Sequence, residues 1–225
     1  MDFLKILKSF EELVYEALIW IILLPKTLIG IVLFPRRMTR YAAAEMAQDD
    51  DVRFSEGITP PLLLILCVVL AHVVDLVIRP QTGVQTGSLA GVVLASEENL
   101  LLYRTIAFGV WALAGAICLL AHAGEAVGRN TLRRPFYEQC YLVAPFALVS
   151  SIGISLSARG NAAEVAGALM LVGSMVWFWC VQVAWIRAWT RVPWWRAALT
   201  ATLVVGGGAA ANAALGHLLS ASPGG

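Results

Sequence analysis

A histidine and an acid inside one long apolar run are the residues best placed to do chemistry. His72 and Asp75 stand three residues apart, so a helix would carry both side chains on one face. Ionisable side chains are costly to bury in hydrocarbon and therefore mark a candidate functional site. The alternative is a shallow ion pair near the membrane surface, made by Asp75 with Arg79 or with Arg104.

A stripe of serines, residues 150 to 157, follows Pro145 in a later apolar run. A proline there should kink a helix or free a carbonyl, and transporters use such broken helices to bind substrate. Alternatively, each serine bonds back to its own helix backbone. The candidate residues of a polar intramembrane site are His72, Asp75, Ser150, Ser151, Ser155 and Asn212.

Cations and aromatic residues gather where apolar runs begin or end. Glu138 stands among them and could pair with Arg134 or contact a partner. Such rings and cations prefer the headgroup level, so they either anchor the helices or contact anionic lipid or another protein. The residues of this candidate inner surface are Arg133, Arg134, Tyr137, Glu138, Trp189, Arg191, Trp194 and Trp195.

The last apolar run is rich in small residues. Small residues spaced four apart let helix backbones approach closely, either between two copies of the chain or within one bundle. Composition leaves both alternatives open. The candidate packing residues are Gly207, Gly208, Ala211, Asn212 and Gly216.

The elements that must position these residues are membrane helices. Hydrophobic residues make up 59% of the chain and charged residues 14%, against about 45–50% and about 25% in soluble proteins. The apolar residues form separate runs long enough for the ~20 helical residues that cross a bilayer. We predict an all-α polytopic membrane helix bundle with five transmembrane helices, at residues 61–78, 105–123, 140–158, 165–186 and 197–216.

Other segments flank this transmembrane domain of residues 61–217. Residues 1–40 predict an amphipathic interfacial or re-entrant segment, because breaks at Pro25 and Pro35 leave no piece long enough to span. Residues 41–60 predict a polar cytoplasmic loop, and residues 218–225 a short external tail. The N-terminus lacks a cleavage site typical of a signal peptide.

The basic residues predict the orientation. All but three of the sixteen fall on one side of the predicted topology, the exceptions being Arg79, Arg104 and Arg159. The positive-inside rule then places the N-terminus in the cytoplasm and the C-terminus outside. We therefore expect a multi-pass protein of the bacterial inner membrane. The segregation of the cations along the chain argues against nucleic-acid binding.

No catalytic or metal-binding pattern stands out. The four cysteines lack the spacing of a zinc site or disulfide framework, and the chain has no phosphate loop, nucleophile elbow or HExxH motif. We expect no enzyme activity, no cofactor and no metal.

The segment Phe136-Tyr137-Glu138-Gln139-Cys140-Tyr141 starts a helix rich in serine and glycine. With five closely spaced spans after a cytoplasmic N-terminal region, it resembles the Yip1-like membrane-protein family over residues 60 to 220. The resemblance implies a non-enzymatic, oligomerising membrane protein; eukaryotic members work with small GTPases in vesicle traffic. No residue of a GTPase contact carries over. The N-terminal segment is also similar to bacterial inner-membrane proteins sometimes labelled permeases.

Two functions are predicted. The first is a scaffold that organises membrane lipids or partner proteins, with a homo-oligomer or another membrane protein as partner. The second is a small-solute or ion permease or channel whose pathway passes His72, Asp75 and the serine stripe.

Overall fold

The computed structural model describes residues 2–48, 53–54, 57–78 and 96–220, and its regular elements within these ranges are all helices. The all-α prediction is confirmed. The helices are α1 (Asp2–Leu33), α2 (Pro35–Glu45), α3 (Pro60–Ile78), α5 (Glu97–Ala123), α6 (Arg129–Ser157), α7 (Asn161–Thr190) and α8 (Trp194–Ser220).

Six helices in the described part of the chain are long and apolar enough to cross a membrane. Five of them, α3 and α5 to α8, contain the five predicted spans, except that Ala158 caps α6 instead of ending it. These helices extend past the apolar runs, since backbone hydrogen bonding continues into the polar flanks. The sixth candidate lies in α1, over Lys8–Leu33.

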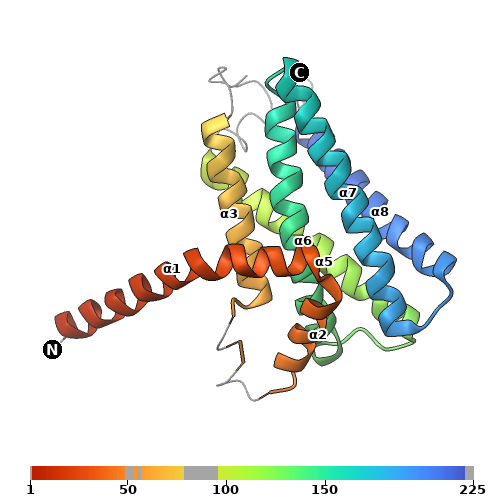
Figure 1. The fold of residues 1–225 in the computed structure, drawn as a ribbon, viewed down its shortest axis with the longest axis horizontal. Coiled ribbons are helices and arrows are strands. Elements are labelled where there is room, and N and C mark those ends of the chain that lie inside the picture. Colours follow the sequence, from red (N-terminus) through yellow and green to blue (C-terminus); the bar gives the residue numbers. More distant parts are fainter. Residues whose placement is uncertain (1, 49–52, 55–56, 79–95, 221–225) are drawn as a thin grey trace.

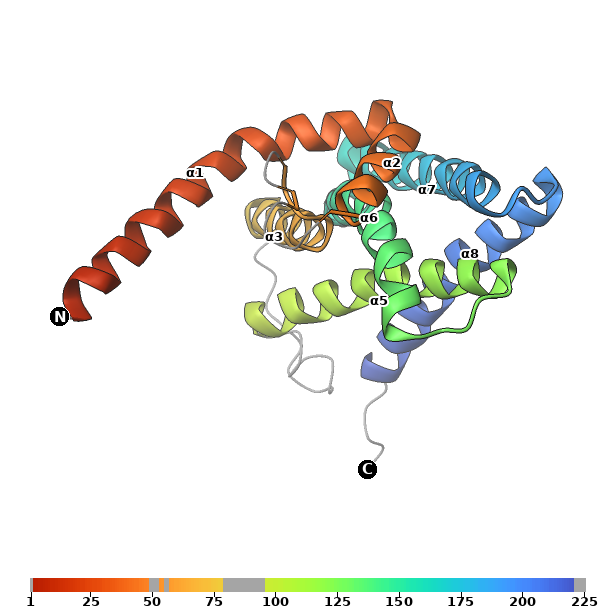
Figure 2. The same ribbon diagram turned by 90° about the horizontal axis from the view of Figure 1, so that it is seen from below.

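Helix α6 lies at the centre of the bundle. Helices α5 and α8 lie on one side of it and α1 and α2 on the other, while α3 and α7 run alongside (Figures 1 and 2). In the most apolar stretch of α6, 67% of the residues are buried, against at most 39% in the other candidate spans. Helix α6 is therefore the element that the others share.

An aromatic cluster joins α6 to its neighbours. The ring of Phe146 stacks on Phe178 of α7, with centroids 4.5 Å apart, and meets Trp111 of α5 edge-on at 4.9 Å. Phe108 lies one turn before Trp111 and stacks on its indole. Offset and edge-to-face pairs of this kind add to the dispersion energy that holds membrane helices together.

Helix α1 differs from its prediction in one respect. It continues through Pro25 as one helix and ends at Leu33, so the expected break at Pro25 is wrong. A proline removes one backbone hydrogen bond, and this loss is tolerated in long apolar helices. Helix α1 crosses α3 and α6 instead of running alongside them (Figure 1), and only 11% of its most apolar stretch is buried.

The described residues of the segment from 41 to 60, predicted as a solvated loop, pack against the bundle. Helix α2 extends to Glu45, whose carboxylate accepts a hydrogen bond from the backbone N–H of Phe54. The side chains of Phe54 and Ile58 are buried, and the hydroxyl of Tyr141 in α6 donates to the Ile58 carbonyl at 2.9 Å. Two apolar residues in a polar stretch thus fix its path.

Helix α2, the α5–α6 connection and the α7–α8 connection lie at one end of the bundle (Figure 1), hereafter the α2 end. The α6–α7 connection lies at the opposite end. Arginines of α2 and of the first turns of α6 therefore share one end, as the alternation of charge along the sequence requires.

Candidate functional site

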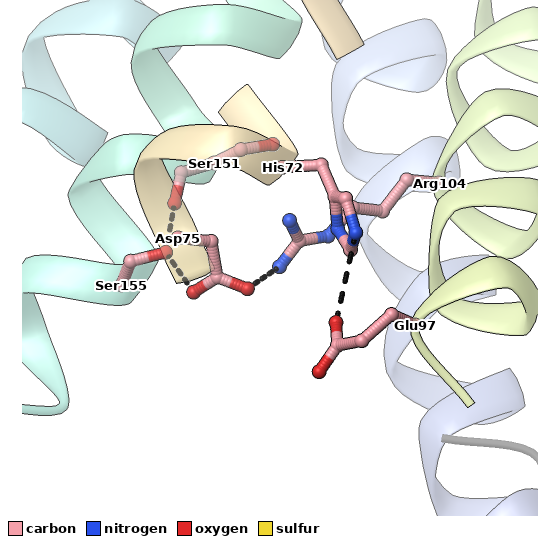
Figure 3. Close-up of polar contacts among 6 residues, drawn as sticks. All are labelled: His72, Asp75, Glu97, Arg104, Ser151 and Ser155. Atoms are coloured by element: carbon pink, nitrogen blue, oxygen red, sulfur yellow. Dashed lines mark hydrogen bonds and ion pairs between the residues drawn. The ribbon is translucent and has the colours of Figure 1, made fainter. Parts of the chain in front are cut away.

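The intramembrane polar residues of α3 form a buried network with α5 and α6 (Figure 3). A guanidinium nitrogen of Arg104 lies 2.8 Å from one carboxylate oxygen of Asp75, and Ser155 donates to the other at 2.6 Å. The Asp75 and Arg104 side chains are 4% and 14% exposed, so their attraction is weakly screened. A buried charge requires this kind of pairing and hydrogen bonding.

His72 lies on the same face of α3, one turn before Asp75. Its Nε2 is 3.6 Å from a carboxylate oxygen of Glu97, at the start of α5 (Figure 3). His72 Nδ1 and Arg104 NH1 are buried and have no hydrogen-bond partner among the described residues.

The structure brings together four of the six residues predicted for this site. His72, Asp75, Ser151 and Ser155 come together, and the Ser151 carbonyl also accepts from Ser155 at 3.0 Å. Ser150 instead bonds back to the Phe146 carbonyl at 2.6 Å. Asn212, in α8, accepts from the Tyr103 hydroxyl instead. Arg79, the other predicted partner of Asp75, lies outside the described residues.

A second polar centre surrounds Glu138 at the α2 end. Its carboxylate is 2% exposed and accepts hydrogen bonds from Trp185 at 2.6 Å, from Trp189 at 2.7 Å and from Arg134 at 3.1 Å. The Arg134 guanidinium also lies over the Trp189 ring, 4.4 Å from its centroid. Three donors satisfy this buried carboxylate and fix both indoles in place.

A cavity of about 380 Å³ opens beside Glu138, between α2, α6 and α7. Its walls combine arginines, indoles and apolar side chains. They are Pro35, Arg36, Thr39, Arg40, Ala43, Arg134, Glu138, Leu142, Val181, Trp185, Ala188 and Trp189. We call this cavity the arginine pocket.

The predicted inner-surface residues also fall into two groups, those that line the arginine pocket and those that do not. Arg134, Glu138 and Trp189 line the arginine pocket, whereas the others lie around it or at the α7–α8 connection. Arg133 lies over the Tyr137 ring, which packs near Phe54. The side chains near the α7–α8 connection are exposed, namely those of Arg191, Trp194 and Trp195.

A pair of buried amides links α6 to α7. Gln139 and Gln182 exchange two hydrogen bonds of 2.8 and 2.7 Å, so each amide satisfies the other. Gly115 of α5 makes room for them, because a Cβ there would lie 2.7 Å from the Gln139 amide carbon. The two amides at the centre of the bundle thus bond to each other and link two helices.

The small residues of α8 pack partly against α5. Trp111 occupies the space at Gly208 and donates to the Val204 carbonyl at 3.0 Å. Asn212 accepts from the Tyr103 hydroxyl at 3.2 Å. Gly207 faces open space, whereas only the helical backbone is described at Ala211 and Gly216. Gly208 and Asn212 thus serve packing within one chain.

The predicted inner-surface site left out Trp185 and Arg36, which line the arginine pocket, and the predicted intramembrane site left out Glu97. Trp185 stands one helical turn from Trp189, a predicted site residue, and Arg36 stands one turn from Arg40. Helical spacing could therefore have identified both residues. No local pattern indicates the Gln139–Gln182 pair. The partners are 43 residues apart, and only the tertiary packing brings them together.

The chain matches no protein family, no curated protein and no solved structure.

Proposed function

We propose that this chain is a non-catalytic, multi-pass membrane protein that acts as a scaffold for lipids or partner proteins. One observation carries the proposal. Buried polar groups such as the Gln139–Gln182 pair and the Asp75–Ser155 contact bond one helix to another, while the α2 end presents a pocket walled by three arginines and two indoles. Internal polar contacts rigidify the bundle, and a basic aromatic surface suits anionic headgroups or a partner.

The finer parts of the proposal follow from the sequence. They are a Yip1-like family membership, a place in the bacterial inner membrane, a cytoplasmic N-terminus and an external C-terminus. Five helices would span, and α1 would lie at the membrane interface. Its crossing of the bundle and its low burial support this arrangement of α1.

Purification in mild detergent tests the scaffold. We expect a mass above that of one chain and its detergent, from self-association, a co-purifying protein or retained lipid. Native mass spectrometry of the intact particle distinguishes self-association, a bound protein and bound lipid by their added masses. A strictly monomeric protein that retains no partner and is indifferent to lipid would refute the proposal.

A permease or channel is the second candidate, and one observation favours it. Buried His72 Nδ1 and Arg104 NH1 lack partners among the described residues, as expected of groups that contact a passing solute or water. Flux into vesicles containing the purified chain, compared with vesicles containing Asp75→Asn, tests this candidate. Flux that depends on Asp75 would favour it over the scaffold; no flux for any solute tried would count against it.

A further inference from the structure

The arginine pocket carries more positive charge than its one carboxylate offsets. Glu138 already accepts from Arg134 and from two indoles. Arg36 and Arg40 stand one turn apart on α2, and neither has a carboxylate within 4.0 Å among the described residues. Two guanidinium groups therefore remain for an external anion, and their planar forks suit the oxygens of a phosphate group.

A second cavity of about 680 Å³ adjoins the arginine pocket. The two share four lining residues, Pro35, Arg36, Arg40 and Val181. Away from the shared wall its lining becomes mainly apolar and runs between the end of α1 and the side of α7. That part is lined by Val32, Leu33, Phe34, Arg37, Trp177, Cys180 and Ala184. We call this cavity the apolar groove.

Together the two cavities match the polarity of a phospholipid, because one is lined by cations and the other is mainly apolar. Cations lie at the α2 end, where Trp and Arg side chains indicate the headgroup level. The groove continues along α7 towards the middle of the bundle, where an acyl chain lies in a membrane. A free phosphate ion would use only the pocket, and a neutral lipid would use only the groove.

We propose that the arginine pocket and the apolar groove together bind one anionic glycerophospholipid. Arg36 and Arg40 hold its phosphate, Trp189 lies against its glycerol region, and one acyl chain occupies the groove. The pocket volume of about 380 Å³ lies in the range of about 300–1,000 Å³ typical of small-ligand sites. This inference deepens the proposed scaffold function and rests on it.

Native mass spectrometry of the full chain in a neutral detergent tests the site, with titration by phosphatidylglycerol, phosphatidylcholine or inorganic phosphate. We expect phosphatidylglycerol to bind about tenfold more tightly than phosphatidylcholine. Arg36→Gln with Arg40→Gln should remove that preference, because both phosphate-binding cations are lost. Arg129→Gln is the matched control, an exposed arginine at the same end but outside the pocket. It should keep the preference.

A groove variant separates a lipid from a free ion. Ala184→Trp fills the apolar groove and leaves the arginines in place. It should weaken phosphatidylglycerol binding about tenfold and leave phosphate binding unchanged. Circular dichroism and elution volume check that each variant is folded, and the single variant Arg40→Gln replaces the double one if that fails.

The opposing results are specific. Tight phosphate binding with no effect of Ala184→Trp would overturn the lipid assignment in favour of a free anion. Equal binding of both lipids, or an equal loss in Arg129→Gln, would overturn the site itself. With either of these results, an oligomer or partner complex on the same spectra would leave the scaffold proposal standing. A monomer with no partner and no lipid preference would refute both the lipid site and the scaffold.

Discussion

Asp75 shows how a single charge becomes tolerable in a membrane helix. Its carboxylate contacts Arg104 and Ser155, which come from two other helices. Continuum estimates and mutational data agree that breaking a buried pair is much more damaging than replacing it as a whole. The network therefore fixes the arrangement of α3, α5 and α6 whether or not it also serves a solute.

Replacing Asp75 by Asn should destabilise the protein by about 3–5 kcal/mol, because Arg104 would be left as an unpaired buried cation. The double variant Asp75→Asn with Arg104→Gln should recover much of that loss. Unfolding in mixed detergent, measured for both single variants and the double one, gives the coupling energy. Additive losses would contradict a buried ion pair.

Two adjacent glycines of α8 offer a matched test of close packing. An alanine at Gly208 would place its Cβ against the Trp111 indole ring, whereas at Gly207 it would meet nothing within 4 Å. Gly208→Ala should cost about 1–3 kcal/mol. Gly207→Ala should be neutral or slightly stabilising, since alanine favours helix. Unfolding of both variants in detergent measures the difference, and equal stabilities would contradict the contact.

Sequence reasoning succeeded at this scale where partners are close in the chain. Glu138 and Arg134, one helical turn apart, pair as one predicted alternative has it. The choice of Arg104 for Asp75 was one of two open alternatives. The donation by Ser155 was not foreseen, because serine stripes look alike whether they bond to their own backbone or across helices.

Glycines also set the crossing of α6 with α7. A Cβ at Gly167 would lie 2.5 Å from the Gly153 carbonyl oxygen and from the Ser157 backbone nitrogen. Backbone atoms cannot move aside as a side-chain tip can. The two helices therefore approach as closely as they do because both positions lack a side chain, as in other membrane helix pairs.

Gly167→Ala should force α6 and α7 apart and destabilise the bundle by about 1–3 kcal/mol. Gly173→Ala, in the same helix, is the control because a Cβ there meets nothing within 4 Å. Thermal unfolding followed by circular dichroism compares them. A loss of stability in Gly173→Ala as large as that in Gly167→Ala would mean that the close approach is not responsible.

At the scale of helices, length and apolarity predicted the positions of α3 and α5 to α8, because hydrocarbon thickness sets how many apolar residues must be consecutive. They did not predict the path of α1 or of residues 41 to 60. The effect of Pro25 depends on what the helix packs against, and the path near Phe54 and Ile58 depends on distant side chains. Neither can be read from a local window.

For the whole molecule, the sequence predicts which compartment each connection faces. A membrane-impermeant maleimide should label Ser9→Cys and Asn130→Cys from one side and Arg159→Cys from the other, because five spans and an interfacial α1 give that pattern. Vesicles of both orientations supply the control. Ser9 labelled from the side of Arg159 would make α1 a sixth span, and Asn130 labelled from that side would contradict the topology.

Glu138 and Ser155 belong to the same uninterrupted helix, α6. At 1.5 Å per residue they lie about 26 Å apart along its axis, close to the thickness of the hydrocarbon layer. One continuous helix therefore carries Glu138 of the arginine pocket and Ser155 of the Asp75 network at two different levels of the bundle. A shift of α6 along its axis would therefore disturb the hydrogen bonds of Glu138 and of Ser155 together.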